Sequence, residues 1–244
     1  MAHLSGKPLA LFEAYLQNWF CRDYALADMC GVAPEFLDEL TQARAAPGVV
    51  YRMDREGHEW SALSAYLGEA QQPLVAPVAA WRTPAAAAWI RQAALLQQRP
   101  EKTAALLQGR FADDYQNALQ ALPAPLKSYG EQIGDAADAW DAWVKGAYAV
   151  CMRAFSANAV VEKLTRRLRA RELINVGADA LTLEEKQLLL EDITRLSEIL
   201  TPFAPFERNI GTPGTVIDRG LAMLGLGTEN PFGDTSFAPL LEAC

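Results

Sequence analysis

The chain has 244 residues, 51% of them apolar, and a formal net charge of −8. This length and composition are typical of one large or two modest folded domains and exclude a disordered chain. The negative charge argues against non-specific nucleic-acid binding, which depends on neutralising phosphates with Lys and Arg. The apolar runs are shorter than the roughly 20 residues of a membrane span, and the N-terminus lacks the pattern of a signal peptide. We therefore expect a cytoplasmic protein with no membrane partner.

Three helices are predicted near the N-terminus, and a tight turn joins the second of them to the third. Residues 9–20 place apolar side chains on one helical face, and a short helix over 24–30 follows with Asp23 as its N-cap. Gly31 supplies the turn, and Pro34 suits the first position of the next helix.

A β-hairpin is predicted directly after the helix that begins at Pro34. Residues 49–54 are β-branched and aromatic, Arg-Glu-Gly makes a turn, and residues 58–67 return as the second strand. Helix, turn, helix and hairpin in this order are the layout of a winged helix-turn-helix. We predict such a domain, with its small hairpin, over residues 1–75.

The charges of this domain bear on its partner. The helix that begins at Pro34, which is the second helix of the helix-turn-helix, carries Glu35, Asp38 and Glu39. A DNA reader needs donors for base edges and phosphates at these positions. Arg52 and Arg55 in the wing are the basic residues that remain for phosphate contact. A protein or peptide partner is therefore favoured over nucleic acid, which stays an alternative. An extended peptide would add to an exposed strand edge of the hairpin.

Beyond three prolines (Pro73, Pro77 and Pro84) the pattern is almost entirely helical. The overall prediction is thus a mainly α protein, with a C-terminal helical bundle domain over residues 84–244. A capping box of Thr182 and Glu185 marks one helix start. Helices are expected over 84–98, 101–121, 135–155, 157–173, 182–201 and 213–225, with a break at 122–126.

The cysteines and histidines are too few and too far apart for a common metal site. His3 and His58 are the two histidines, so no pair has helical ligand spacing. No Cys-x-x-Cys occurs, and we expect free thiols, no metal and no cofactor. The cysteines are Cys21, Cys30, Cys151 and Cys244.

Two stretches of the C-terminal half carry a family resemblance: GAYAVCMRAFSANAVVEK at 146–163 and LTPFAPFERNIGTPGTVID at 200–218. They resemble a bacterial family of unknown biochemical function whose members are described as natural-product biosynthesis proteins and open with a helix-turn-helix-like segment. The resemblance implies a motif, and with it a candidate ligand or partner site, made of Tyr148, Cys151, Arg153, Lys163, Phe203, Glu207 and Arg208, together with Gly146, Val150, Pro202, Ala204 and Pro205.

Residues of this motif also invite chemical hypotheses. Cys151 would be a nucleophile if a cation activated it, but a cysteine on an apolar stripe is more often a small buried hydrophobe. Arg153 suits a bidentate carboxylate. We expect a structural ion pair between Arg153 and Glu207 or Glu162, with a ligand carboxylate as the alternative.

A basic run follows the motif cysteine. Lys163, Arg166, Arg167 and Arg171 are predicted to cluster on one side of a helix. We expect a solvated helix face, with a contact to an anion, an acidic partner or a nucleic acid as the sharper alternative.

Together these features predict a non-catalytic accessory protein of a natural-product pathway that binds a partner enzyme or peptide. The first alternative is a DNA-binding regulator similar to the mercury-resistance regulators. It would use the wing arginines or the basic run, and its helical domain would serve as an effector or dimerisation domain. The second alternative is a cofactor-free enzyme with its site near Cys151 and Arg153.

Overall fold

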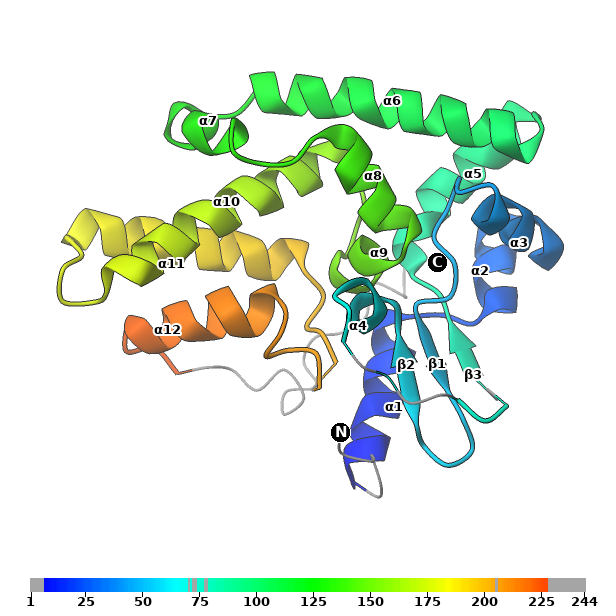
Figure 1. Ribbon diagram of the computed structural model, residues 1–244, viewed down its shortest axis with the longest axis horizontal. Coiled ribbons are helices and arrows are strands. Elements are labelled where there is room, and N and C mark those ends of the chain that lie inside the picture. Colours follow the sequence, from blue (N-terminus) through cyan, green and yellow to red (C-terminus); the bar gives the residue numbers. More distant parts are fainter. Residues whose placement is uncertain (1–6, 70, 72–73, 77–78, 205, 228–244) are drawn as a thin grey trace.

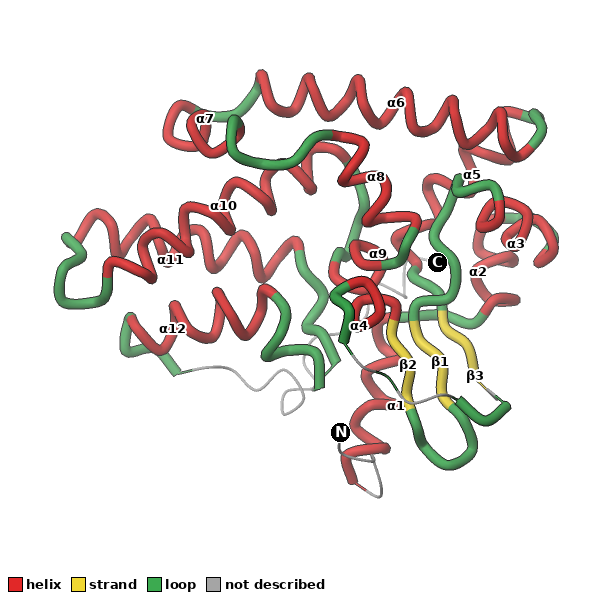
Figure 2. Tube along the Cα trace, in the orientation of Figure 1, coloured by secondary structure: helices red, strands yellow, loops and turns green. Residues whose placement is uncertain are grey.

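The computed structural model describes residues 7–69, 71, 74–76, 79–204 and 206–227. It is mainly helical, with one small antiparallel sheet (Figures 1 and 2), which confirms the predicted mainly α class. The predictions on His3, Pro73, Pro77, Pro205 and Cys244 fall outside the described residues. No helix in the described part of the chain combines the length and apolarity that crossing a bilayer requires.

The elements follow in chain order. The N-terminal third contains α1 (Lys7–Trp19), α2 (Asp23–Cys30), α3 (Pro34–Gln42), β1 (Tyr51–Met53), β2 (Glu59–Ser61), α4 (Ala62–Tyr66) and β3 (Ala79–Trp81). A 3-10 turn (Pro84–Ala86) leads into α5 (Ala87–Leu96), α6 (Pro100–Gln120), α7 (Ala124–Gly130), α8 (Ala136–Val144) and α9 (Ala147–Cys151). Last come α10 (Ala157–Val176), α11 (Leu183–Ile199), a π-helical turn (Pro213–Asp218) and α12 (Arg219–Met223).

The turn between α2 and α3 has the expected residues. Gly31 ends α2 in the left-handed conformation, at a φ of 68°, which costs glycine little. Pro34 takes the first helical position of α3. The predicted N-cap is wrong, because α2 begins at Asp23 and its N-cap is Arg22. The side chain of Asp23 accepts a hydrogen bond from Arg82.

The sheet differs from the predicted hairpin in two ways. The returning strand stops at Ser61, because its hydroxyl accepts hydrogen bonds from the N–H groups of Leu63 and Ser64 and so opens α4. A third strand, β3, arises from the stretch between the two predicted domains and gives the order β2-β1-β3. Tyr51 in the central strand therefore faces Ser61 on one side and Trp81 on the other.

α8 packs against α6, and α9 packs against α4 (Figure 1). α10 and α11 lie side by side, and α6 runs across α8 and α10. The single helix predicted over 135–155 is two helices, because Gly146 takes a φ of 93° between them. A Cβ atom at Gly146 would lie 2.5 Å from the Cβ of Ala62, so the glycine also lets α4 approach α9. The predicted break at 122–126 holds the start of α7.

Buried apolar residues of both predicted domains form one continuous cluster. Its aromatic centre joins α5, α6 and α8, and the ring of Trp143 stacks on that of Phe155 at 4.1 Å. The winged helix-turn-helix and bundle descriptions, and the division into 1–75 and 84–244, stay predictions.

Candidate functional site

A buried cluster of polar side chains surrounds Glu207. The carboxylate is fully buried and accepts hydrogen bonds from the hydroxyls of Tyr51 (2.5 Å), Ser61 and Ser64 (3.1 Å). The hydroxyl of Tyr15 lies 3.3 Å from that of Tyr51 and extends the cluster into α1. The motif residue Glu207 is thereby linked to α1, β1 and α4, which are far from it in sequence.

Burial sets the electrostatics of this cluster. Desolvation raises the pKa of Glu207, although the hydrogen bonds from Ser61, Tyr51 and Ser64 oppose the shift. Desolvation, together with the charge of Glu207, raises the pKa values of Tyr15 and Tyr51 above the usual value of a phenol. Burial therefore shifts Glu207 toward its neutral carboxyl form and both tyrosines toward the neutral phenol.

Cys151 and Lys163 form a second buried contact. The Nζ atom of Lys163 lies 3.0 Å from Sγ of Cys151 and 4.1 Å from the ring centroid of Tyr148. Both Cys151 and Lys163 are 3% exposed. Burial lowers the pKa of Lys163, since desolvation disfavours the ammonium form. The structure thus brings together three residues of the predicted motif, from α9 and α10.

The expected ion pair of Arg153 with Glu207 or Glu162 is wrong. Met152 pairs with Leu200 in an isolated bridge, which directs Arg153 to the C-terminal end of α11. There its guanidinium donates to the carbonyls of Leu200 (2.7 Å) and Ser197 (3.1 Å), where the unpaired carbonyls of a helix end attract cations.

Phe203 and Arg208 make their contacts with other residues of the 200–218 segment. Phe203 is buried at a φ of 63°, and its ring packs so closely on Gly211 that a Cβ there would lie 2.2 Å from it. Arg208 forms two hydrogen bonds of 2.7 Å with Asp218 and donates to the carbonyl of Pro202 at 2.8 Å. Both residues serve the local fold in this structure.

The basic run on α10 faces acids of α11 rather than solvent alone. Arg169 is buried and forms two hydrogen bonds of 2.7 Å with Asp192, which is fully buried. Arg166 pairs with Glu191 (2.9 Å) and Asp192 (2.8 Å), and also with Glu162. The predicted solvated face is wrong for Lys163 and Arg166, because Lys163 is buried and Arg166 is largely neutralised, whereas Arg171 is exposed.

The predicted partner-binding residues of the N-terminal part lie in different settings. Asp38 accepts a hydrogen bond of 2.8 Å from the buried Arg82. Glu35 and Glu39 are exposed, and the described residues offer neither of them an ion-pair partner. Arg52 is exposed and lies 5.1 Å from the ring centroid of Trp60.

The hairpin turn contains Arg55. It also contains the one group of side chains, among the described residues, whose types and spacing suit a metal ion. Arg55 is exposed there. Ligand atoms of Asp54, Glu56 and His58 lie within 4.8 Å of one another. Asp54, however, already accepts from the backbone N–H groups of His58 (2.9 Å) and Val75 (3.3 Å), and Nδ1 of His58 lies 2.9 Å from it. Although burial opposes them, these contacts lower the pKa of Asp54 to about 2. The group therefore stabilises the turn.

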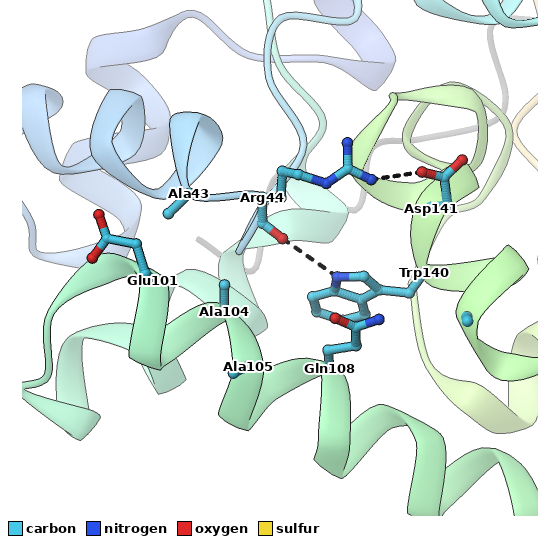
Figure 3. A pocket seen from close by; sticks show the side chains of 9 residues that line it. Ala43, Arg44, Glu101, Ala104, Ala105, Gln108, Trp140 and Asp141 are labelled. Atoms are coloured by element: carbon cyan, nitrogen blue, oxygen red, sulfur yellow. Dashed lines mark hydrogen bonds and ion pairs between the residues drawn. The ribbon is translucent and has the colours of Figure 1, made fainter.

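An open pocket lies where the end of α3 meets α6 and α8 (Figure 3). Its volume is about 390 Å³. Arg44, at a φ of 60°, donates to Asp141 at 2.6 Å and accepts a hydrogen bond of 3.3 Å from the indole of Trp140 through its carbonyl. The lining residues are Ala43, Arg44, Glu101, Ala104, Ala105, Gln108, Ala137, Trp140 and Asp141.

The C-terminal motifs lie within a segment that is similar to known sequences. Residues 107–224 match a family of unknown function, DUF6058. The matched segment is just under half of the chain and contains both motif stretches, whereas α1 to α5 lie outside it. No curated protein and no solved structure matches the chain significantly.

Sequence reasoning missed Tyr15, Tyr51, Ser61 and Ser64 around Glu207, and it also missed Arg82. Its guanidinium donates to Asp23 of α2 (2.6 Å), to Asp38 (2.8 Å) and Thr41 (2.9 Å) of α3, and to the carbonyl of Pro47 (3.3 Å). A lone arginine directly after the apolar run that ends at residue 81 was the available signal. Its partners became visible only in three dimensions.

We expect Arg82→Met to lower the free energy of unfolding by about 2–3 kcal/mol, because hydrogen bonds to charged groups contribute roughly 1.5–3 kcal/mol each and the freed carboxylates regain water. Urea unfolding at neutral pH measures the loss. The control is Arg91→Met, which removes an exposed arginine that donates to the carbonyl of Met29. Its expected change is within about 0.5 kcal/mol. Equal losses in the two variants would contradict an anchoring role for Arg82.

Proposed function

We propose that the protein is a non-catalytic accessory protein that binds a partner protein or peptide through its N-terminal part, and that it serves a natural-product pathway. The observation that carries the binding proposal is the exposed acidic side of α3. Leu37 and Leu40 bury the other side of this helix, and Arg82 fixes it through Asp38. Glu35 and Glu39 are therefore presented on an anchored element. The pathway rests on the resemblance of the two C-terminal motifs alone.

The chemistry of this surface favours a basic partner. Carboxylates without intramolecular partners attract Lys and Arg and repel wrong partners, which gives specificity as well as a faster association rate. The phosphates of DNA would be repelled by the same residues. The predicted helix-turn-helix, with its acidic second helix, is thus better suited to a protein or a peptide.

A DNA-binding regulator is the second candidate, and the exposure of Arg52 and Arg55 favours it. Phosphate contacts from these two arginines would have to offset the repulsion from Glu35 and Glu39. The third idea, an enzyme with its site at Cys151 and Arg153, is disfavoured because Cys151 is buried and Arg153 is engaged by backbone carbonyls.

The test is affinity capture from the native host at physiological salt, with nuclease treatment in parallel, followed by a binding titration with the purified partner. We expect a specific protein or peptide whose recovery is insensitive to nuclease. Glu35→Lys combined with Glu39→Lys is expected to weaken binding at least about ten-fold, since like charges facing each other cost several kcal/mol.

The matched control is Asp113→Lys combined with Asp114→Lys, which makes the same charge change on exposed residues of α6. This control is expected to bind as the wild type does. Recovery of a specific DNA segment that nuclease removes would overturn the proposal in favour of the regulator. Equal weakening by both double variants would show that net charge, and not α3, determines binding.

A further inference from the structure

The contact between Lys163 and Cys151 calls for a chemical explanation. Lysine is almost never fully buried unless it is paired, and a thiol is a weak partner for an ammonium group. The contacts that the structure gives for Nζ are the sulfur of Cys151 at 3.0 Å and the ring face of Tyr148 at 4.1 Å. The carboxylates of the neighbouring network are bound by Arg166 and Arg169 instead. The chain therefore places a desolvated amine directly against a sulfur atom.

The surrounding backbone fixes this arrangement. Cys151 ends α9, and its carbonyl accepts a hydrogen bond of 3.1 Å from the N–H of Thr201. Lys163 lies in the second turn of α10, whose start is capped by the hydroxyl of Ser156. Because burial lowers the pKa of Lys163, a larger share of its side chain is the neutral amine, the form that acts as a nucleophile.

We propose that Cys151 and Lys163 form a peroxide-dependent covalent cross-link, a sulfenamide between Sγ and Nζ. In the first step hydrogen peroxide oxidises the thiol: the O–O and S–H bonds break, an S–O bond forms, and one water leaves. The sulfur is oxidised and the peroxide is reduced. In the second step the lone pair of Nζ attacks the sulfur, an S–N bond forms, and the S–O bond breaks. The departing hydroxide takes a proton from the nitrogen, so a second water leaves.

Proximity lets the attack of Nζ on the sulfur compete with further oxidation of the sulfenic acid by peroxide. A nucleophile held against its target in a fixed geometry reacts as if at very high concentration. Burial also limits the access of further peroxide, which would otherwise carry the sulfenic acid on to sulfinic acid. The first peroxide molecule reaches the buried sulfur through infrequent local opening of the packing around α9, and closure then holds Nζ against the sulfenic acid before a second molecule enters.

The test is a tryptic map of the full-length protein after treatment with hydrogen peroxide under native conditions. Trypsin does not cleave after a lysine whose amine is substituted. We therefore expect peptide 146–153 joined to peptide 154–166, with a mass lower than the sum of the two by that of two hydrogen atoms. The peptides of the unlinked protein, 146–153 and 154–163, should be lost in proportion, and treatment with a thiol reductant before digestion should restore them. Peptides with Cys21 and Cys30 serve as internal references in the same digest.

Lys163→Met removes the amine and keeps an apolar side chain of similar length in the core. In this variant we expect no joined peptide and instead Cys151 oxidised by two or three oxygen atoms. Should the variant fail to fold, the map of the wild type still decides the question. Cys151 that stays reduced at peroxide levels that oxidise Cys30 would overturn the proposal. So would Cys151 sulfinic acid with Lys163 unmodified, or a joined peptide whose fragment ions place an extra oxygen atom between Sγ and Nζ rather than on Met152.

Discussion

Replacing Asp192 by alanine is expected to lower the free energy of unfolding by about 3–5 kcal/mol. The side chain is fully buried, and its two oxygens accept hydrogen bonds from Arg169 and Arg166. Removing one partner of a buried pair leaves the other charge without compensation, which is the costly case. The buried guanidinium of Arg169 would bear this cost. Urea unfolding at neutral pH, followed by circular dichroism, gives the value.

The control for this prediction is the neighbouring Glu191→Ala. Glu191 also pairs with Arg166, at 2.9 Å, but its side chain is 55% exposed. Solvent screens such a pair, so the expected loss is below about 1 kcal/mol. A loss of that size for Asp192→Ala as well would mean that the α10–α11 contact depends on apolar packing alone.

Replacing Glu207 by alanine is expected to cost about 3 kcal/mol or more, because it leaves the buried hydroxyls of Tyr51, Ser61 and Ser64 without their acceptor. Each buried polar group that loses its partner costs roughly 1–3 kcal/mol. Urea unfolding measures the loss. The alternative result, a loss below about 1 kcal/mol, would show that water replaces the carboxylate at no great cost.

Glu207→Gln tests the protonation state of the same carboxyl. Since the pKa of Glu207 is raised in the folded protein, its contribution is fully present below the pKa of an unfolded glutamate and is lost as the pH rises through the raised value. The wild type should therefore lose stability in this pH range, and Glu207→Gln should not. Glu131→Gln, at an exposed position, is the control and should follow the wild type. Parallel curves for all three proteins would contradict a raised pKa of Glu207.

Local signals in the sequence predict much of the fold. The capping box of Thr182 and Glu185, the left-handed Gly31 and the N-terminal Pro34 are all found as expected, because each depends on residues a few positions apart. β3 was missed because its partner strand lies far away in sequence. The break at Gly146 was missed for a similar reason: the residue that demands a glycine there is Ala62 of α4.

The candidate site was predicted less well than the fold. The resemblance marks Cys151, Lys163 and Glu207, but it does not state which of them meet. Helical periodicity placed Lys163 on a basic face with Arg166, whereas in the structure it is buried against Cys151. Arg153 was expected to find a carboxylate, yet the bridge between Met152 and Leu200 directs it to backbone carbonyls. Such partners depend on how helices pack, which no short pattern in this sequence encodes.

The separation between Glu207 and its hydrogen-bond donors has a consequence during synthesis on the ribosome. Ser61 and Tyr51 precede Glu207 by 146 and 156 residues. At a translation rate of about 5–20 residues per second, the N-terminal elements emerge roughly 7–30 s before the carboxyl that completes them. During this interval Tyr51, Ser61 and Ser64 have water as their partner, and α1 lacks the aromatic contact that Phe206 makes with Phe12. The nascent chain therefore exposes an incomplete apolar surface until its last fifth is synthesised, which is the period in which a chaperone would bind it.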